Sequence, residues 1–403
     1  MNDLKKAFYF CGQVIPSDLL EKNFDKLNSY ISAAGNTFYN ALLDGLSENN
    51  DSVYTSVLLP KEISDSCKEN YKGKWNIFFM TTPKNFFIRV FNNFTASIKG
   101  IFRFNRAEKQ AEKYVVFNVL RLGAVIGGLI ACSILGIKKI GVVTDVPGYR
   151  IKTEKKESMF RGFCDFLGQK LIKSFNCYIL LSEAMAQVIP VNDKPYIIIE
   201  GLYRADGDKD ISDLEKYEDY TVMYAGSLHY KYGIMNLVNA VRNTDDPSIR
   251  LLIFGGGEAK DEICRISQED ARICYKGIVS HGEILRQERK ASLLVNPRPV
   301  DDEYVKYSFP SKNMEYMASG TPVLLTNIPS LPNEYKEYVF LAENGSCAEI
   351  QRMITEIKNF EDQNFTVKKA ESARNFILEN KREYIQAARL VEFLDKCERF
   401  NGN

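Results

Sequence analysis

Short apolar runs alternate along this chain with longer segments in which apolar residues recur every three or four positions. Runs of the first kind are typical of strands buried in a parallel sheet, and the second pattern is typical of helices that cover such a sheet. The alternation runs through both halves of the chain, so the sequence predicts an α/β protein. Strands are predicted at 7–11, 52–59, 76–80, 139–144, 177–181, 196–200, 221–225, 250–258, 291–299 and 323–326.

The two halves are separated by residues 202–219, which are rich in Asp, Glu and Lys and poor in aliphatic side chains, as expected of a linker. A chain of 403 residues is also long for a single hydrophobic core. We therefore expect two domains, at 1–201 and 202–375. The remaining segment, 376–403, carries apolar residues at helical spacing and is predicted as a C-terminal helix.

Glycines in the first half suggest a turn and a closely packed helix. Gly35 precedes a helical run at 39–46, and a glycine turn that opens a helix lets the backbone approach a ligand. Residues 122–137 are the most apolar stretch, but as a helix they would extend only about 24 Å. This is short of the ~30 Å hydrocarbon core of a membrane. Gly123, Gly127 and Gly128 suit close packing on a sheet, so we expect a buried crossover helix instead.

Residues 84–106 combine basic and aromatic side chains without a single acid. An amphipathic, basic, aromatic helix is what binding at a membrane interface requires. The alternative is a helix packed on its own domain with its charges in solvent. The basic residues are Lys84, Arg89, Lys99, Arg103 and Arg106.

The second half contains a short predicted helix with unusual chemistry at its start, over 308–326. Ser308 or Ser311 can cap this helix, and Pro310 suits its first turn. Lys312 adds a positive charge where the helix dipole already favours an anion such as phosphate. Glu315 lies one turn further on the same face and can accept hydrogen bonds from a sugar diol. These features together suit a nucleotide sugar.

This stretch resembles the donor-binding signature of the retaining family-4 glycosyltransferases, which have the GT-B fold. Glu315 matches the second Glu of the signature, and residues 318–322, Ala-Ser-Gly-Thr-Pro, match its tail. Tyr307 stands where the family has its first Glu. The Ser-Phe-Pro-Ser-Lys variant is similar to the branch that builds bacterial surface and capsular polysaccharides. The resemblance implies two Rossmann-like domains with a cleft between them, and a last helix that crosses back to the first, acceptor-binding domain.

The resemblance also implies which residues hold the donor. The loop at 226–233 corresponds to the family's diphosphate loop, with Ser227 where Arg is common. Arg298 is expected to help replace that lost charge. The segment at 273–279 is expected to face the nucleobase through its backbone. Candidate donor-binding residues are Gly226, Lys231, Gly255, Ile278, Arg298, Ser311, Lys312 and Glu315, with Lys312 and Glu315 also catalytic.

Asp145 is the third candidate catalytic residue, because it follows the predicted strand at 139–144. Ligands of open α/β sheets bind at the carboxyl ends of strands, where Asp145 can orient an acceptor hydroxyl or take its proton. The alternative is an Asp that only caps a turn. Relatives often have a His here, whereas this chain has Thr144, and only two histidines in all. Of these, His281 is interpreted as a helix cap.

Composition excludes several other classes of function. A net charge of +1 gives no case for nucleic-acid binding, and nine scattered cysteines predict neither a disulfide framework nor a zinc site. A reducing cytosol fits them best. We expect no metal and no cofactor. The only Asp-x-Asp runs, at 206–208 and 208–210, lie in the predicted linker and are interpreted as solvated loop acids.

The function predicted from these features is transfer of a sugar, with retention, from a nucleoside-diphosphate sugar to a lipid-linked oligosaccharide. The resemblance implies a UDP-sugar as the donor. The enzyme would work without a metal, as a cytoplasmic protein bound peripherally to the inner face of the plasma membrane. Two alternatives remain: a catalytically inactive GT-B-like partner subunit, which Tyr307 favours, and a sugar-nucleotide epimerase, which shares this architecture.

Overall fold

The computed structural model describes residues 5–27, 30–49, 51–82, 85–146, 159–189, 191, 193–205 and 214–401. These residues divide into two compact units. Unit 1 consists of residues 1–202 together with 383–403, and unit 2 consists of residues 203–382. The Asp-x-Asp runs at 206–208 and 208–210, and Lys84 of the predicted membrane segment, lie outside the described residues.

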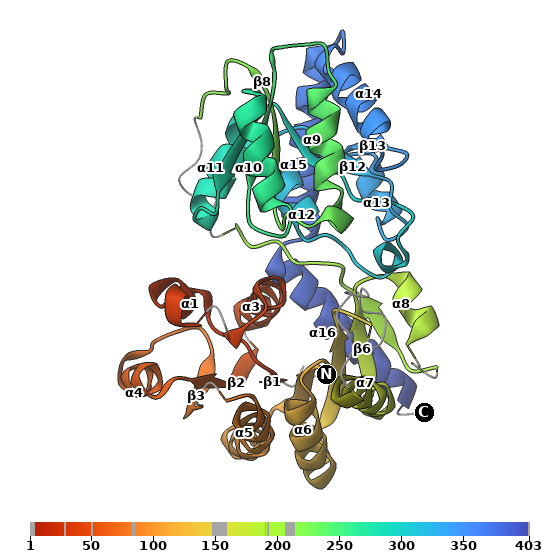
Figure 1. The fold of residues 1–403 in the computed structure, drawn as a ribbon. Coiled ribbons are helices and arrows are strands. Elements are labelled where there is room, and N and C mark those ends of the chain that lie inside the picture. The colour runs from red at the N-terminus through yellow and green to blue at the C-terminus, as the bar shows by residue number, and fades with distance from the viewer. Residues whose placement is uncertain are drawn as a thin grey trace. The chain divides into compact units, whose positions relative to one another are not determined.

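Unit 1 is built on a parallel sheet with the order β3-β2-β1-β4-β5-β6-β7 (Figure 1). Its strands are β1 (Lys6–Cys11), β2 (Ser52–Leu59), β3 (Asn76–Thr81), β4 (Glu112–Asn118), β5 (Lys138–Val143), β6 (Cys177–Leu180) and β7 (Tyr196–Ile198). The order reverses direction between β1 and β4, which makes this the switch point of the sheet.

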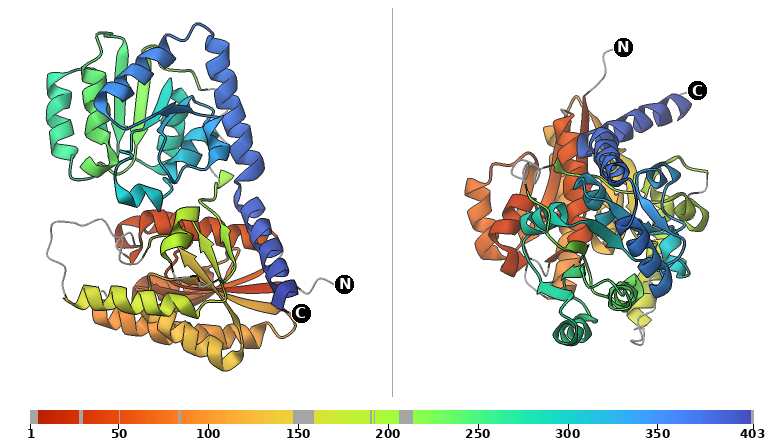
Figure 2. Two further views of the ribbon diagram at one scale, coloured as in Figure 1. Left: turned by 90° about the vertical axis from the view of Figure 1, so that its right-hand side faces the viewer. Right: turned by 90° about the horizontal axis from the view of Figure 1, so that it is seen from above.

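Helices cover both faces of this sheet (Figure 2, left). They are α1 (Ser17–Lys22), α2 (Phe24–Leu27), α3 (Ala33–Glu48), α4 (Lys61–Asn70), α5 (Phe86–Ala107), α6 (Leu122–Leu135), α7 (Met159–Leu171), α8 (Glu183–Val188) and α16 (Glu383–Asn401). Alternate residues of β1 face opposite layers, as the pleat of a strand requires. Phe8 and Phe10 pack in the cluster formed with α3 and α16, whereas Tyr9 contacts Phe104 of α5.

Unit 2 repeats the plan with the parallel order β10-β9-β8-β11-β12-β13, the doubly wound Rossmann order. Its strands are β8 (Tyr220–Ala225), β9 (Ile249–Phe254), β10 (Ile273–Gly277), β11 (Leu293–Asn296), β12 (Val323–Thr326) and β13 (Phe340–Ala342). Its helices are α9 (Ile234–Arg242), α10 (Lys260–Glu269), α11 (His281–Lys290), α12 (Lys312–Ala318), α13 (Asn333–Lys336), α14 (Cys347–Lys358) and α15 (Gln363–Asn380). Two short 3-10 helices, η4 (Tyr230–Tyr232) and η5 (Glu303–Lys306), lie in its loops.

The predicted α/β architecture is confirmed, with parallel sheets in both units. The crossover helix predicted at 122–137 is α6, and it packs on α5 so closely that a Cβ on Gly127 would lie 2.3 Å from the Phe94 carbonyl oxygen. In the part of the chain that the structure describes, no helix is long and apolar enough to cross a membrane. β4, at the centre of the unit 1 sheet, was not among the predicted strands.

Two local predictions are wrong. Gly35 is not a turn: it lies in the first turn of α3, which begins at Ala33 because the helical pattern of 39–46 extends back through small residues. The C-terminal segment is not one helix either. α15 ends at Asn380 and α16 begins at Glu383, with Lys381 and Arg382 between them. Lys381 and Arg382 belong to unit 2, whereas α16 belongs to unit 1.

The docking of α16 on α3 gives a first prediction. A Cβ on Gly45 of α3 would lie 2.2 Å from the Glu383 carbonyl oxygen, so Gly45→Ala must push α16 away. We expect a loss of about 1–3 kcal/mol of stability in unit 1, measured by calorimetry of the full chain.

Gly35→Ala is the matched control on the same helix. Its Cβ would have 3.7 Å to the nearest side-chain atom, an ordinary contact. Replacing a helical glycine by alanine there should stabilise by about 0.5–1 kcal/mol. Equal effects of the two substitutions would contradict the close approach of α16 to Gly45.

Candidate functional site

The candidate residues of unit 2 gather at the switch point of its sheet, where β8 and β11 are neighbours. Gly226 follows β8 directly and begins the loop that ends at Gly233. Pro297 and Arg298 follow β11, and the glycine run 255–257 follows β9. Because all strands of this sheet are parallel, these loops leave the same edge, where ligands of open α/β sheets bind.

Two glycines let these loops approach each other more closely than any side chain would allow. Gly255 has a φ of 126°, and a Cβ there would lie 1.9 Å from the Gly226 carbonyl oxygen. Gly233 has a φ of 77°, and its Cβ would lie 1.9 Å from the Pro297 carbonyl oxygen. The loops after β8, β9 and β11 therefore pack backbone against backbone and form one surface.

Two cations share one aromatic ring on this surface. The Arg298 guanidinium lies 4.5 Å from the Tyr232 ring centroid and 5.9 Å from that of Tyr304, and the Lys231 ammonium lies 5.2 Å from the Tyr232 ring. The Tyr304 hydroxyl donates to the Lys231 carbonyl oxygen at 3.0 Å. Burial, reinforced by the Arg298 charge and opposed by Glu258, lowers the pKa of Lys231. An anion bound beside both cations would relieve their repulsion.

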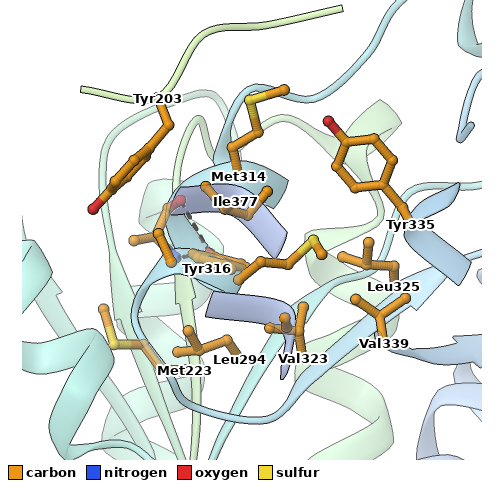
Figure 3. Packing of buried hydrophobic residues seen from close by; sticks show 14 of the residues in the cluster. Tyr203, Met223, Leu294, Met314, Tyr316, Val323, Leu325, Tyr335, Val339 and Ile377 are labelled. Atoms are coloured by element: carbon orange, nitrogen blue, oxygen red, sulfur yellow. Dashed lines mark hydrogen bonds between the residues drawn. The ribbon is translucent and has the colours of Figure 1, made fainter. Parts of the chain in front are cut away.

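Helix α12 is attached to the ends of both central strands. The Tyr316 hydroxyl accepts from the Ala225 N–H at 2.8 Å and donates to the Ala225 carbonyl at 3.2 Å, which ties α12 to β8. Figure 3 shows this phenol inside the core, among Met314, Ile377 and other apolar side chains. The Asn296 amide donates to the Asn313 side chain at 2.6 Å, which ties the helix start to β11.

The predicted pair on α12 is formed. The Lys312 ammonium lies 2.6 Å from Glu315 Oε2, and the His281 Nδ1 lies 3.9 Å from the same oxygen. Burial alone would raise the pKa of Glu315, but the Lys312 and His281 charges outweigh it and lower the pKa. Burial likewise opposes the charge of Lys312, yet the carboxylates of Glu315 and Glu288 raise its pKa. The Glu315 carboxylate is therefore held ionised at a partly exposed position, where it can accept hydrogen bonds.

Glu288 of α11 completes this cluster, and no motif or spacing in the sequence indicates it. Its side chain is fully buried, its Oε1 lies 3.8 Å from the Lys312 ammonium, and neither carboxyl oxygen has a hydrogen-bond partner among the described residues. Burial, with Lys312 opposing and Glu315 adding, raises the pKa of Glu288 to about 8. Burial therefore favours the protonated form of Glu288, although it lies among the charged residues of 286–290 in the sequence.

Ile278, predicted near the nucleobase, is the most exposed of the large apolar residues described, at 78%. It follows β10, and a Cβ on Gly256 would lie 3.1 Å from its Cδ1. The side chain therefore stands beside the glycine run of the neighbouring strand, where it offers an apolar contact to a ligand on that loop.

The structure brings most predicted donor residues to one edge of unit 2 but changes two local interpretations. Ser311 precedes α12 in a helical conformation and makes no capping hydrogen bond through its side chain. His281 is not the cap of α11: Ser280 is, because its hydroxyl accepts from the Glu283 N–H, and His281 is the first helical residue. This frees the imidazole to approach Glu315.

Asp145 lies in unit 1, after the carboxyl end of β5. The Thr144 hydroxyl donates to its Oδ2 at 3.4 Å. The strand-end position agrees with the residue's predicted place in the fold. Its catalytic role stays a prediction.

Comparison with known proteins agrees with this architecture. Residues 207–378 match the family model described as glycosyl transferases group 1. No curated protein sequence matches the chain. Among solved structures, sucrose-phosphate synthase from Thermosynechococcus elongatus aligns at a TM-score of 0.69 with 13% identity, over 99% of this chain and 100% of its own.

Two further structures are similar over nearly their whole length. The Anabaena protein HepE, in complex with UDP and glucose, aligns at a TM-score of 0.64 with 14% identity, over 97% of this chain and 100% of its own. A glycosyltransferase from Rickettsia africae aligns at 0.66 with 14% identity, over 98% of both chains. The fold is GT-B, and residues 207–378 match the group 1 glycosyl transferases.

The buried Glu288 gives a prediction about stability. Its pKa of about 8 exceeds the value near 4.3 expected in the unfolded chain. The folded state therefore holds more protons between these values, and stability falls as pH rises, by about 1.4 kcal/mol per pH unit. Glu288→Gln should remove this slope, which urea unfolding at pH 5.5 and 7.5 would measure.

Glu283→Gln, at the exposed beginning of the same helix, is the control. Hydrogen bonds from Gln287 and Arg286 lower the pKa of Glu283, so its charge does not change over this range. The control should keep the slope of the unmodified protein. The same slope in the Glu288 variant would mean that Glu288 is already ionised at pH 5.5.

Proposed function

We propose that this protein is a retaining glycosyltransferase that moves a sugar from a nucleoside-diphosphate sugar, UDP-sugars foremost, to a lipid-linked oligosaccharide of a bacterial surface polysaccharide. The observation that carries the proposal is the meeting of two kinds of group at one sheet edge of unit 2. Cations and exposed backbone suited to a diphosphate lie there with an ionised carboxylate, Glu315, suited to a diol.

The comparisons favour a UDP-sugar as donor. Solved structures of HepE contain UDP, UDP with glucose, or UDP-glucose. TarM, a further structural relative, was solved with UDP and α-GlcNAc-glycerol. The structure of WaaB is described as that of a lipopolysaccharide outer core galactosyltransferase. We extend the donor class, and the surface-polysaccharide acceptor class, to this chain.

Each residue of the cluster has a proposed role. Glu315 accepts hydrogen bonds from the ribose hydroxyls, and Ile278 contacts the nucleobase. Lys231 and Arg298 neutralise the departing diphosphate, helped by backbone N–H groups of the Gly226 loop. Fixed charges of this kind stabilise a leaving group without reorganisation when the bond breaks, which is why no metal is required in this proposal.

Lys312 has two possible partners in this scheme. In the structure its ammonium is bound to Glu315, so it first holds that carboxylate in place. A bound diphosphate competes for the same ammonium, because phosphate oxygens accept charge-assisted hydrogen bonds as well as a carboxylate does. Asp145 of unit 1 is proposed to orient the acceptor hydroxyl or take its proton.

An inactive GT-B-like subunit is the second candidate, favoured by one observation. Tyr307 occupies the position of the family's first Glu and follows η5 directly. Its neutral hydroxyl offers one acceptor oxygen to a donor sugar, whereas a carboxylate offers two anionic ones. UDP binding without transfer to any acceptor would favour this candidate, and conversion of UDP-GlcNAc to an isomer by the protein alone would favour an epimerase.

We also propose that unit 1 contacts an anionic membrane surface and that the protein lies peripherally on the inner face of the plasma membrane. Helix α5 exposes Ile88, Val90 and Phe91 near its start, and Lys99, Arg103 and Arg106 later. The adjoining helix α6 exposes Ile130 and Ile134, by 43% and 67%. Apolar and basic side chains on neighbouring helices suit an interface of lipid headgroups.

The donor-site assignment is tested by Lys312→Ala and Glu315→Ala. Each removes charge-assisted hydrogen bonds worth about 1.5–3 kcal/mol, so UDP should bind about 10–150-fold more weakly. Transfer of sugar should fall below detection in both. Calorimetry measures UDP binding, and mass spectrometry of products from a panel of UDP-sugars measures transfer.

The exposed residues Lys368 and Glu371 of α15 provide matched controls, since they have the same three-residue spacing. Lys368→Ala and Glu371→Ala should leave binding and transfer unchanged. Unaltered UDP binding and transfer in the two site variants would remove the donor site from α12.

The membrane proposal is tested by replacing Lys99, Arg103 and Arg106 with Gln. Each basic residue near an anionic surface contributes about 1 kcal/mol, so binding to anionic liposomes should weaken about 100-fold. Arg89 is kept, because it is only partly exposed and its guanidinium lies 5.3 Å from the Tyr30 ring centroid. Arg103 also lies near a ring, 5.7 Å from the Phe78 centroid, but is exposed.

Replacing Lys61, Lys68 and Lys72 with Gln makes the same change of charge elsewhere on unit 1 and should not affect liposome binding. If both triple variants bind liposomes like the unmodified protein, α5 is not the membrane contact. Equal weakening in both would indicate attraction by net charge alone.

A further inference from the structure

Glu288 has no role in the proposed transfer, yet it is the only described acid that combines full burial with two carboxyl oxygens lacking a hydrogen bond. Burying a carboxyl group without hydrogen bonds is costly, so such a group is uncommon unless its environment uses it. Its nearest charge is the Lys312 ammonium, at 3.8 Å from Oε1.

We propose that Glu288 is a positioning residue for the donor site: as a neutral acid it leaves the Lys312 ammonium to Glu315, and as a carboxylate it draws that ammonium away, so that donor affinity falls when Glu288 ionises. This inference rests on the proposed function, because it assumes that a nucleoside diphosphate binds at Glu315 and Lys312.

The Lys312 ammonium can pair with either of two carboxyl groups, Glu315 or Glu288. In the structure its ammonium is 2.6 Å from Glu315 and 3.8 Å from Glu288, so it belongs to the first and needs to move little to reach the second. The side chain of Lys312 is 28% exposed, whereas that of Glu315 is 19% and that of Glu288 0% exposed. One ammonium cannot fully compensate two carboxylates in so dry a site.

Other charged and titratable groups around Glu288 do not replace Lys312. Arg289, on the same helix, stabilises the Glu288 charge less than Lys312 does, and Tyr316 lies on the other side as a neutral phenol. His281 approaches Glu315, not Glu288. Lys216 donates to the Ala291 carbonyl and to the Thr321 hydroxyl, which in turn donates to the Glu288 backbone oxygen.

A bound diphosphate would be a third anionic group beside the Lys312 ammonium, in addition to Glu315 and Glu288. Its negative charges lie on the same side of the cluster as Lys312, and they oppose a further negative charge on Glu288. Binding therefore favours the protonated Glu288, and a proton moves from the buffer to its carboxyl oxygen. By linkage, a ligand whose binding takes up a proton binds more weakly as pH rises.

The experiment is calorimetric titration of the full chain with UDP from pH 7.5 to 9.5. The second ionisation of a phosphate, with a pKa near 6, is complete in this range. We expect UDP affinity of the unmodified protein to fall with rising pH, by as much as tenfold per unit once Glu288 ionises. Titrations in two buffers of different ionisation enthalpy should show uptake of a fraction of a proton at pH 8.

Glu288→Gln is permanently neutral and nearly the same shape, and Glu288→Met serves the same purpose if the amide does not fold. Both should bind UDP at pH 9 more tightly than the unmodified protein does, with a much smaller pH slope and no proton uptake. Glu283→Gln, on the exposed beginning of the helix, should behave like the unmodified protein.

The outcomes separate this inference from the function beneath it. If UDP binds and the slope persists in both Glu288 variants, another group such as Lys216, whose pKa burial lowers to about 8, carries the pH dependence and the inference is wrong. If UDP binding is independent of pH in every variant, the inference is also wrong, but the donor site stands. If the unmodified protein binds no UDP at any pH, both proposals fall.

Discussion

One ammonium shared between two carboxyl groups is the interaction on which the candidate site depends. The Lys312 ammonium lies 2.6 Å from Glu315 and 3.8 Å from Glu288, whose pKa is raised by burial. The surrounding structure enforces this arrangement. Tyr316 fastens α12 to β8, and the Asn296–Asn313 contact fastens it to β11, so that the short helix cannot rotate its charged face away. The chemistry of the site is thus a property of a rigid core beneath it.

The sequence predicted those parts of the site that have a local signature. Gly255 and Gly233 stand in glycine-rich loops after strands, and their positive φ values explain why only glycine fits there. Lys312 and Glu315 are three residues apart, so their pairing follows from helical geometry alone. Arg298 follows a strand, and its place at the sheet edge follows from the parallel topology. In each case a few neighbouring residues determine the outcome.

Other features arise only from tertiary packing. Glu288 lies in the run Arg-Gln-Glu-Arg-Lys, whose composition is typical of a solvated helix face, yet the fold buries its side chain completely. The hydrogen bonds of Tyr316 to Ala225 join residues 91 positions apart. β4 was missed although Val115 and Val116 favour a strand, because it follows a long helix without a glycine or proline between them. The helix break after Asn380 likewise has no proline or glycine to mark it.

The return of α16 to unit 1 has a consequence for how the protein is made. Ala387, Leu390 and Leu394 belong to the same apolar cluster as Phe8, Phe10 and Tyr114. The ribosome synthesises Ala387, Leu390 and Leu394 only after it has translated the whole of unit 2. Until then the part of α3 and of the unit 1 sheet that α16 covers stays exposed. Synthesis of unit 1 therefore begins first, but its core is completed after that of unit 2. A nascent chain in this condition is a natural client for chaperones that shield apolar surface.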